Sequence, residues 1–316
     1  MANRDKNGRA FEFICLKVLH QKIESVRKAE IIKDLAFESA QRAWDSLNSA
    51  DLKRNFQKSA ERFADTIFEC EPLMLEAGDD LVELAIQKDF KGEAADVRDI
   101  VVSRAHIQWE IGFSLKSNHK AAKHSRLSKD LDFGEKWLGV KASFDYFSAI
   151  APVFEHLENL KAQGKKWRDL PNKVAQIYAP VLNAFQKELL RITTANKSAV
   201  RHLGEYLLGK FDYYKVIHLD HQKTVQIQTF NLRKTLNQRG KTAPKLIIPA
   251  SALPRRIEFV RFKEKSQNTL MLQLDEGWLF SLRIHNAATK VEPSLKFDIQ
   301  IKAMPTSVLV INCQWR

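Results

Sequence analysis

Two short strand-like runs within residues 96–136 constrain the fold of this chain more than any other feature. The first run, residues 100–102, is β-branched and is preceded by two aspartates; the second extends over residues 107–116. The few residues between the runs, 103–106, have the character of a turn. Two such runs with a short connection predict an antiparallel β-hairpin.

The register of this hairpin decides which polar side chains meet. If the chain turns near residue 107, Asp99 lies opposite Lys116, and Ser114 is a diagonal neighbour. An acid that begins one strand is then paired with a lysine that ends the next. The hairpin therefore predicts a local acid–lysine–hydroxyl group.

Alternation along the second run separates its side chains into two faces. The apolar face, which we expect to be buried, comprises Trp109, Ile111, Phe113 and Leu115. The polar face comprises Glu110, Gly112, Ser114 and Lys116. A dense basic segment follows, with Lys116, His119, Lys120, Lys123, His124 and Arg126. One face is thus predicted to be core, and the other to carry an acid, a lysine and a hydroxyl beside further cations.

Composition bounds the class of protein. The 316 residues suit one large or two ordinary domains, and 44% hydrophobic residues are enough for a core. The formal net charge of +13 favours a polyanionic partner, with nucleic acid ahead of a membrane surface. A basic but otherwise ordinary enzyme is the alternative.

Cysteine usage and the N-terminus indicate the compartment. Cys15, Cys70 and Cys313 are scattered and form neither a disulfide framework nor a zinc-binding spacing, which suits a reducing environment. The N-terminus has no apolar signal segment, and no run has the length of a membrane span. We expect a soluble cytoplasmic protein without a membrane partner.

Helical and strand patterns divide the chain into two regions. Apolar residues at helical spacing predict helices over 8–30, 31–47, 51–77, 79–90, 145–160, 171–193 and 198–208, and a short basic helix or turn over 118–127. From about residue 211 the pattern predicts strands, at 224–230, 245–248, 257–263, 269–275, 278–284, 295–302 and 307–311. We therefore predict an α/β (α+β) fold: a helical and mixed core over 1–208 and a β-rich region over 209–316, with a basic loop at 231–245.

The residue types on the polar face of the hairpin suit phosphodiester hydrolysis. This reaction needs a divalent cation held by oxygen ligands, an activated water and neutralisation of charge on the phosphoryl oxygens. Asp99 and Lys116 are residues of the right types on neighbouring strands. A surface ion pair on a hairpin looks the same, and is the default interpretation of the pair taken alone. The basic segment after Lys116 and the net charge favour a nuclease.

Several stretches of the chain resemble a known family. GRAFEFICL, DVRDIVV, EIGFSLKSNHKAAKHSRLS, DFGEKW and the late FSLRIHNA and VEPSLKFDIQ are similar to the HaeIII-type type II restriction endonucleases, and the wider pattern resembles the PD-(D/E)XK nucleases. The resemblance covers most of the chain. It implies a nuclease-like mixed core, Mg²⁺ as cofactor and cleavage of double-stranded DNA at GGCC.

The resemblance also implies roles for individual residues. Asp99 would be the metal-binding aspartate and Lys116 the catalytic lysine. PD-(D/E)XK nucleases usually carry Asp or Glu two residues before the lysine, whereas this chain has Ser114. This departure leaves the second metal ligand open. Glu12, in the first predicted helix, is the first choice; Glu110 and then Asp96 are the alternatives.

Contacts to DNA are expected from two places. His119, Lys120, Lys123, His124 and Arg126 would contact phosphates, and Arg283, His285 and Asn286 of the β-rich region would take part in recognition. A palindromic target would suggest a homodimer, and a cognate DNA methyltransferase would protect the host. A non-specific or structure-specific repair nuclease, or an inactive DNA-binding protein with a degenerate core, are the alternative functions.

Overall fold

The chain divides into two compact units. The computed structural model describes residues 2–88, 96–118, 121–286 and 288–315, and for 2–5 and 121–124 it describes the backbone only. The first unit comprises Met1–Lys120, Gly209–Ser251 and Thr306–Arg316, and the second comprises Ala121–Leu208 and Ala252–Pro305. The chain passes from the second unit back to the first between residues 208 and 209, which is the predicted domain boundary. Residues 209–251 and 306–316, however, belong to the first unit. That two-domain division stays a prediction.

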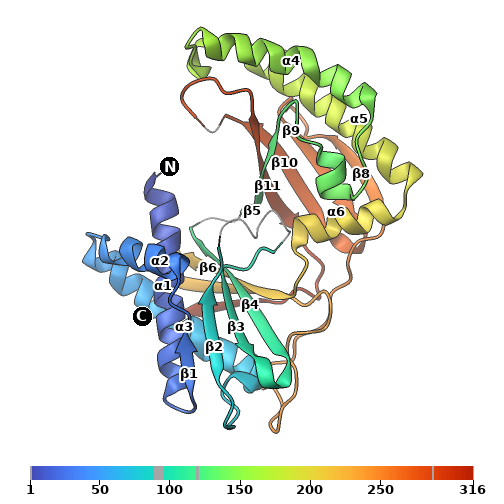
Figure 1. Ribbon diagram of the computed structural model, residues 1–316. Coiled ribbons are helices and arrows are strands. Elements are labelled where there is room, and N and C mark those ends of the chain that lie inside the picture. The colour runs from blue at the N-terminus through green and yellow to red at the C-terminus, as the bar shows by residue number, and fades with distance from the viewer. Residues whose placement is uncertain (1, 89–95, 119–120, 287, 316) are drawn as a thin grey trace. The chain divides into compact units, whose positions relative to one another are not determined.

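The first unit is built on a seven-stranded sheet (Figure 1). In spatial order its strands are β1 (Ala29–Ile31), β2 (Val82–Ile86), β3 (Ile100–Arg104), β4 (Trp109–Ser117), β6 (Tyr213–Leu219), β7 (Thr224–Phe230) and β12 (Val310–Gln314). The pairs β1–β2 and β4–β6 are parallel and the others antiparallel, so the sheet is mixed. The predicted hairpin is β3–β4, and it lies in the interior of this sheet.

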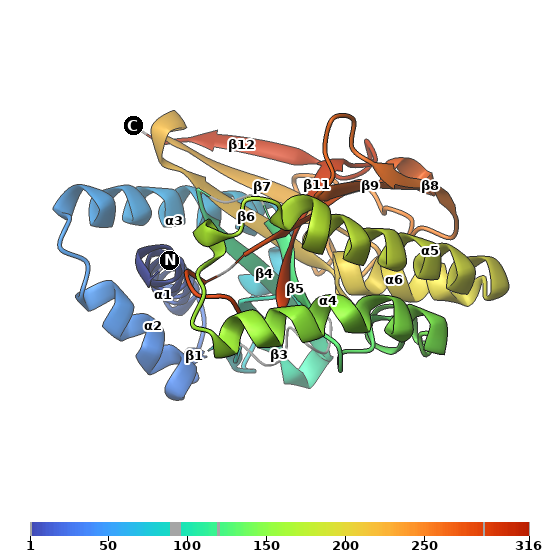
Figure 2. The same ribbon diagram turned by 90° about the horizontal axis from the view of Figure 1, so that it is seen from above.

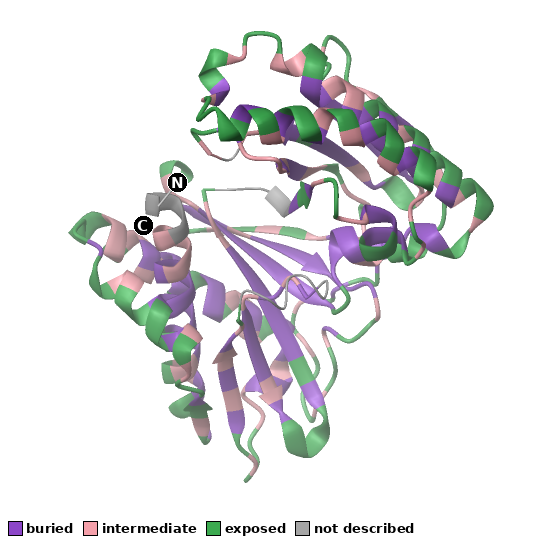
Figure 3. Ribbon diagram, turned by 45° about the horizontal axis from the view of Figure 1, so that its top comes forward, coloured by how far each residue is buried: buried purple, intermediate pink, exposed green. Residues whose placement is uncertain are grey.

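Three long helices belong to the first unit. They are α1 (Ala2–Glu24), α2 (Leu35–Asp45) and α3 (Ala50–Cys70). Asp34 and Ser49 begin α2 and α3 by accepting hydrogen bonds from backbone N–H groups of the first turn. Helix α1 packs against both other helices and against β4. Figure 3 shows the buried strands of the sheet beside helices whose outer sides are exposed.

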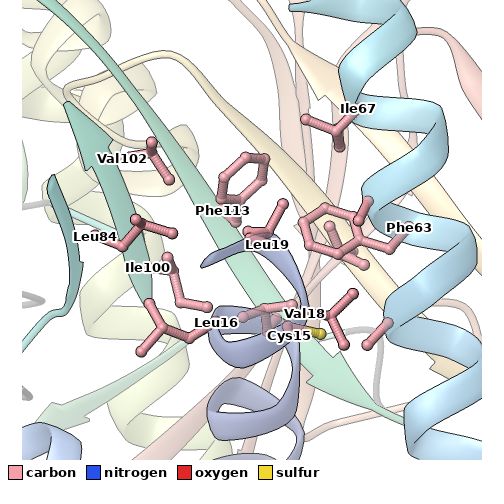
Figure 4. Packing of buried hydrophobic residues seen from close by; sticks show 14 of the residues in the cluster. Cys15, Leu16, Val18, Leu19, Phe63, Ile67, Leu84, Ile100, Val102 and Phe113 are labelled. Atoms are coloured by element: carbon pink, nitrogen blue, oxygen red, sulfur yellow. The ribbon is translucent and has the colours of Figure 1, made fainter. Parts of the chain in front are cut away.

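The core of the first unit lies between the helices and one face of the sheet (Figure 4). Leu16 and Leu19 of α1 and Phe63 of α3 are fully buried there, together with Phe113 of β4. The rings of Phe63 and Phe113 meet edge to face, with centroids 5.0 Å apart. Burial of each such side chain contributes roughly 1.5–3 kcal/mol, so this packing fixes α1 on β4.

The second unit is a five-stranded antiparallel sheet with three long helices (Figures 1 and 2). The strand order is β5 (Ala121–Leu127), β11 (Leu295–Ala303), β10 (Leu279–His285), β9 (Thr269–Leu274) and β8 (Ile257–Phe262). The helices are α4 (Phe144–Ala162), α5 (Ala179–Ala195) and α6 (Ser198–Leu208). Phe185 of α5 packs on Phe297 of β11, with ring centroids 5.2 Å apart. Among the described residues, no helix combines the length and apolar character that crossing a membrane requires.

The mixed α/β class predicted from sequence is confirmed, and several elements differ from the prediction. Residues 79–88 do not form the predicted helix, and residues 89 and 90 lie outside the described residues. Val82, Leu84 and Ile86 alternate inward in β2, a two-residue period read as a helical one. The short basic helix or turn predicted over 118–127 is wrong for residues 121–127, which form β5 against β11, and residues 119 and 120 lie outside the described residues. No strand forms at 245–248, where two backbone N–H groups bond to the Glu69 carbonyl. Strand β6 is absent from the predicted strands, and β12 begins three residues later than predicted.

A buried histidine of β6 gives the first unit a pH dependence. The ring of His218 is fully buried among Phe56, Phe11 and Trp315, with centroids 4.8, 5.5 and 5.0 Å away. This burial lowers the pKa of His218 from 6.5 to about 4, although Asp220 Oδ1 lies 3.5 Å from Nε2. Between pH 4 and 6.5 the unfolded chain therefore binds more protons than the folded chain, and stability falls as pH falls.

We expect His218→Phe to weaken this dependence while the aromatic packing is kept. Urea unfolding at pH 7.5 and at pH 5 measures it, and the loss of stability on acidification should shrink by on the order of 1–2 kcal/mol. The matched control is His221→Gln, three residues along in the exposed turn, which should leave the dependence unchanged. An unaltered pH dependence in His218→Phe would rule out His218 as its source.

Candidate active site

The β3–β4 hairpin places Asp99 beside Ser114. Ile100 pairs with Phe113, and the Asp99 N–H donates to the Phe113 carbonyl at 2.7 Å. The turn occupies residues 105–108, with Gln108 at φ 53°. The predicted register, with Asp99 opposite Lys116, is wrong by two residues because the turn is centred one residue earlier. A shift of two residues keeps every side chain on its face.

The two faces of β4 have the characters that alternation predicts. Trp109, Ile111, Phe113 and Leu115 are all buried in the core of the first unit. The opposite face carries Glu110, Gly112, Ser114 and Lys116. Because β4 lies between β3 and β6, this polar face has a strand on each side. Asp99 therefore contacts an interior strand of the sheet. A surface ion pair on an isolated hairpin would have no such surroundings.

The carboxylate of Asp99 is bound by three consecutive residues of β4. Its Oδ2 accepts the Leu115 N–H at 2.6 Å, the Lys116 ammonium at 3.0 Å and a longer bond from the Ser114 hydroxyl at 3.4 Å. The Lys116 and Asp99 side chains are 27% and 24% exposed, respectively. The pair is therefore fixed by the strand and still open to a ligand.

Glu12 of α1 lies in the electrostatic field of this pair. Its carboxylate is buried and accepts a hydrogen bond from Arg9 Nη1 at 2.8 Å. Burial and, to a smaller extent, the negative charge of Asp99 raise the pKa of Glu12 from 4.5 to about 8, against the opposing effect of Arg9 and Lys116. Packing of α1 on β4 thus brings Glu12, Asp99 and Lys116 together from distant parts of the sequence.

The other two acids considered as ligands are engaged elsewhere. Asp96 accepts Nε and Nη2 of Arg98, each at 2.8 Å, and Glu110 accepts Nη1 of the same arginine at 2.5 Å. No interaction of either acid with Asp99 or Glu12 is part of the described structure. Geometry therefore favours Glu12 over Glu110 and Asp96 as the partner of Asp99.

The donor set fits a hard divalent cation that also binds substrate. Among the described residues, no group of three or more His, Cys, Asp or Glu side chains forms a complete metal site. Mg²⁺ is commonly held by one or two carboxylates together with waters and substrate phosphates, and two carboxylates are what Asp99 and Glu12 would supply. Burial first, and the charge of Asp99 second, disfavour the ionised form of Glu12, and a bound cation would favour that form.

Residues predicted to bind DNA belong to other parts of the chain. His119 and Lys120 lie outside the described residues, and Lys123 and His124 are described only as backbone of β5. Arg126 is half exposed and lies 3.6 Å from Glu292. Arg283 lies 3.3 Å from Asp298, and burial lowers the pKa of His285 at the end of β10. Asn286, next in sequence, accepts a 3.5 Å bond from Tyr178.

Sequence reasoning missed two arginines beside the site. Arg9 precedes Glu12 by three residues in a helix, a spacing that brings opposite charges together and so could have been recognised. Arg98 stands between Asp96 and Asp99, and only the fold shows that it also reaches Glu110. The basic loop at 231–245 is held in place: the Asp212 carboxylate accepts N–H groups of Leu232, Arg233 and Thr235.

The raised pKa of Glu12 predicts that this residue destabilises the metal-free protein at alkaline pH. Between pH 4.5 and 8 the folded chain binds more protons than the unfolded chain, so stability falls as pH rises. Glu12→Gln should therefore stabilise the metal-free protein at pH 8.5 by on the order of 2 kcal/mol, and much less at pH 5. Denaturant unfolding measures this. Glu24→Gln, at an exposed position of the same helix, is the control, and a destabilised Glu12→Gln at pH 8.5 would contradict the prediction.

Comparison with known proteins points in the same direction as the geometry. No solved structure matches the chain. The type II restriction enzyme HaeIII of Haemophilus aegyptius is 42% identical over 318 residues, covering 100% of this chain and 99% of that protein. The sequence profile of the HaeIII restriction endonuclease family matches residues 8–305. The chain therefore belongs to the HaeIII restriction endonuclease family, and the predicted resemblance to type II restriction enzymes is confirmed.

Proposed function

We propose that this protein hydrolyses double-stranded DNA at a specific sequence in a Mg²⁺-dependent reaction. The observation that carries the proposal is that Asp99, directly before β3, binds Lys116 of β4 and acts electrostatically on Glu12 of α1, in a chain of the HaeIII family. Hydrolysis of a phosphodiester needs oxygen ligands for a cation and a positive group near the scissile phosphate. These three residues supply both.

Each residue has a distinct role in this proposal. Asp99 and Glu12 hold Mg²⁺, which when bound polarises the phosphoryl group and lowers the pKa of a water. Lys116 binds the scissile phosphate or the attacking water, and its ammonium, 3.0 Å from Asp99, is already oriented by that carboxylate. Ser114 replaces the carboxylate usual at this place in PD-(D/E)XK nucleases and orients Asp99 through its hydroxyl. Glu110 has no ligand role, because Arg98 occupies it.

The proposed target is GGCC, the sequence that the resemblance implies. Arg283, His285 and Asn286 are proposed to take part in recognition, while His119, Lys120, Lys123, His124 and Arg126 contact phosphates. A palindromic target is matched by a homodimer, in which each protomer cleaves one strand. Inside the cell, a cognate DNA methyltransferase would then be needed to protect the host genome.

Serine at position 114 favours a second candidate, an inactive DNA-binding protein with a degenerate core. A non-specific or structure-specific repair nuclease is the third candidate. Digestion of plasmid DNA with Mg²⁺ and mapping of the cut ends separates all three. We expect discrete fragments whose ends map to GGCC. A smear would identify a non-specific nuclease, and binding without cleavage of any duplex would identify the inactive protein.

Asp99→Ala should abolish cleavage, because the substitution removes a metal ligand. DNA binding should stay intact, because no positively charged side chain is removed. Cleavage of a GGCC-containing duplex and a gel-shift titration without metal measure the two properties. Asp79→Ala, at an exposed acid of the same unit, is the control and should cleave normally. Glu12→Gln should lower the rate by about 100-fold or more if it completes the metal shell. Substantial cleavage by Asp99→Ala would remove that residue from the site.

A further inference from the structure

We propose that Arg98 is a positioning residue that fixes the Asp99 carboxylate on β4. The inference rests on the proposed role of Asp99 as a metal ligand. Arg98 immediately precedes Asp99 in sequence, is buried, and makes contacts with three separate segments of the first unit. None of these contacts involves the reacting groups, so its effect on the reaction is exerted through Asp99.

Asp96, two residues earlier in the chain, binds both the backbone and the side chain of Arg98. The Asp96 carboxylate accepts the Arg98 backbone N–H at 3.1 Å, Nε at 2.8 Å and Nη2 at 2.8 Å. The paired side-chain bonds have the fork geometry that only a guanidinium provides. They close residues 96–98 into a compact unit directly before Asp99.

The guanidinium of Arg98 also contacts Glu110 of β4 and the ring of Phe211. Nη1 donates to Glu110 at 2.5 Å, and the guanidinium carbon lies 4.0 Å from the centre of the Phe211 ring. The stem of Arg98 crosses Gly112, where an added Cβ would lie 2.0 Å from Arg98 Cδ. Glycine at this position is therefore required for the arginine to lie against the strand.

One face of β4 thus holds two consecutive residues of the chain. Glu110 and Gly112 receive Arg98, and Ser114 and Lys116 receive Asp99. The backbone of Asp99 is bonded on both sides, to the Phe113 carbonyl at 2.7 Å and from the Gln87 N–H at 2.8 Å. With its neighbour clamped and its backbone bonded, the carboxylate of Asp99 has little freedom to move. Metal and phosphate chemistry requires this precision, since displacements of roughly 1 Å cost large factors in rate.

Strand β3, which follows Arg98 and Asp99, offers a matched control residue at its far end. Arg104 is also buried and also binds an aspartate in bidentate fashion, with Nε and Nη2 at 2.8 and 2.7 Å from Asp80. It donates a further bond to the Leu73 carbonyl at 2.9 Å. Arg98→Met and Arg104→Met therefore each remove a buried, paired guanidinium from β3 or its flank. A merely structural role would give the two variants the same phenotype.

The experiment compares Arg98→Met, Arg98→Lys, Gly112→Ala and Arg104→Met below the unfolding temperature of each. We expect kcat for cleavage to fall by roughly 10- to 100-fold in Arg98→Met, with a higher Mg²⁺ concentration for half-maximal rate, and to stay within about twofold of wild type in Arg104→Met. Arg98→Lys should recover part of the loss, because it restores the charge without the fork. Gly112→Ala, which displaces Arg98 without removing it, should resemble Arg98→Met.

A second readout needs neither metal nor DNA. The Leu115 N–H donates to Asp99 at 2.6 Å, so hydrogen exchange at this amide in the metal-free protein reports on the position of the carboxylate. Exchange should accelerate at least about tenfold in Arg98→Met and not in Arg104→Met, at equal global stability. Equal effects of the two variants on kcat, Mg²⁺ dependence and exchange would overturn the inference. Cleavage by Asp99→Ala would instead overturn the proposed function on which it rests.

Discussion

The site depends on a buried acid, Glu12, that lies in the field of a second and partly exposed acid, Asp99. The carboxylate of Asp99 is fixed by a backbone N–H and an ammonium of β4, and Glu12 is buried close enough for its pKa to rise to about 8. Core packing of α1 on the sheet enforces this arrangement, which costs stability without a cation. Strain of this kind is typical of functional sites, because the protein gives up stability that a substrate or metal restores on binding.

The positively charged side chains of the first unit determine which of its acids are available to bind a metal ion. The first unit places several acids near the start of β3, but Arg98 occupies Asp96 and Glu110. Asp99 and Glu12 are paired with Lys116 and Arg9, single-donor contacts that a stronger cation could displace. The difference between a structural and a functional carboxylate here is therefore whether the buried guanidinium of Arg98 already binds it. Serine at position 114 is consistent with a second acid that comes from a helix.

Family membership and site geometry support the same activity from independent directions. The comparisons cover the whole chain without singling out any residue, and the geometry singles out residues without a reference to any relative. In the second unit, Arg283 and His285 lie in β10 and Asn286 is the residue after it. Strand β5 contains Lys123, His124 and Arg126 of the basic segment that follows Lys116. In sequence, β5 of the second unit follows shortly after β4, the strand that carries Lys116.

The β3–β4 hairpin, the two faces of β4 and the closeness of Asp99 to Lys116 follow from the sequence alone, although their register does not. A two-residue period is a local property that a small error in the turn does not change. The sequence also identified Glu12 as a candidate, through the resemblance to a family. That β2 and β5 are strands became clear from the tertiary structure alone, since short segments take the form that their neighbours in space impose. Tertiary structure likewise decided that Arg98 binds Glu110 and that Glu12 approaches Asp99. Such contacts join residues far apart in the chain, and no local period encodes them.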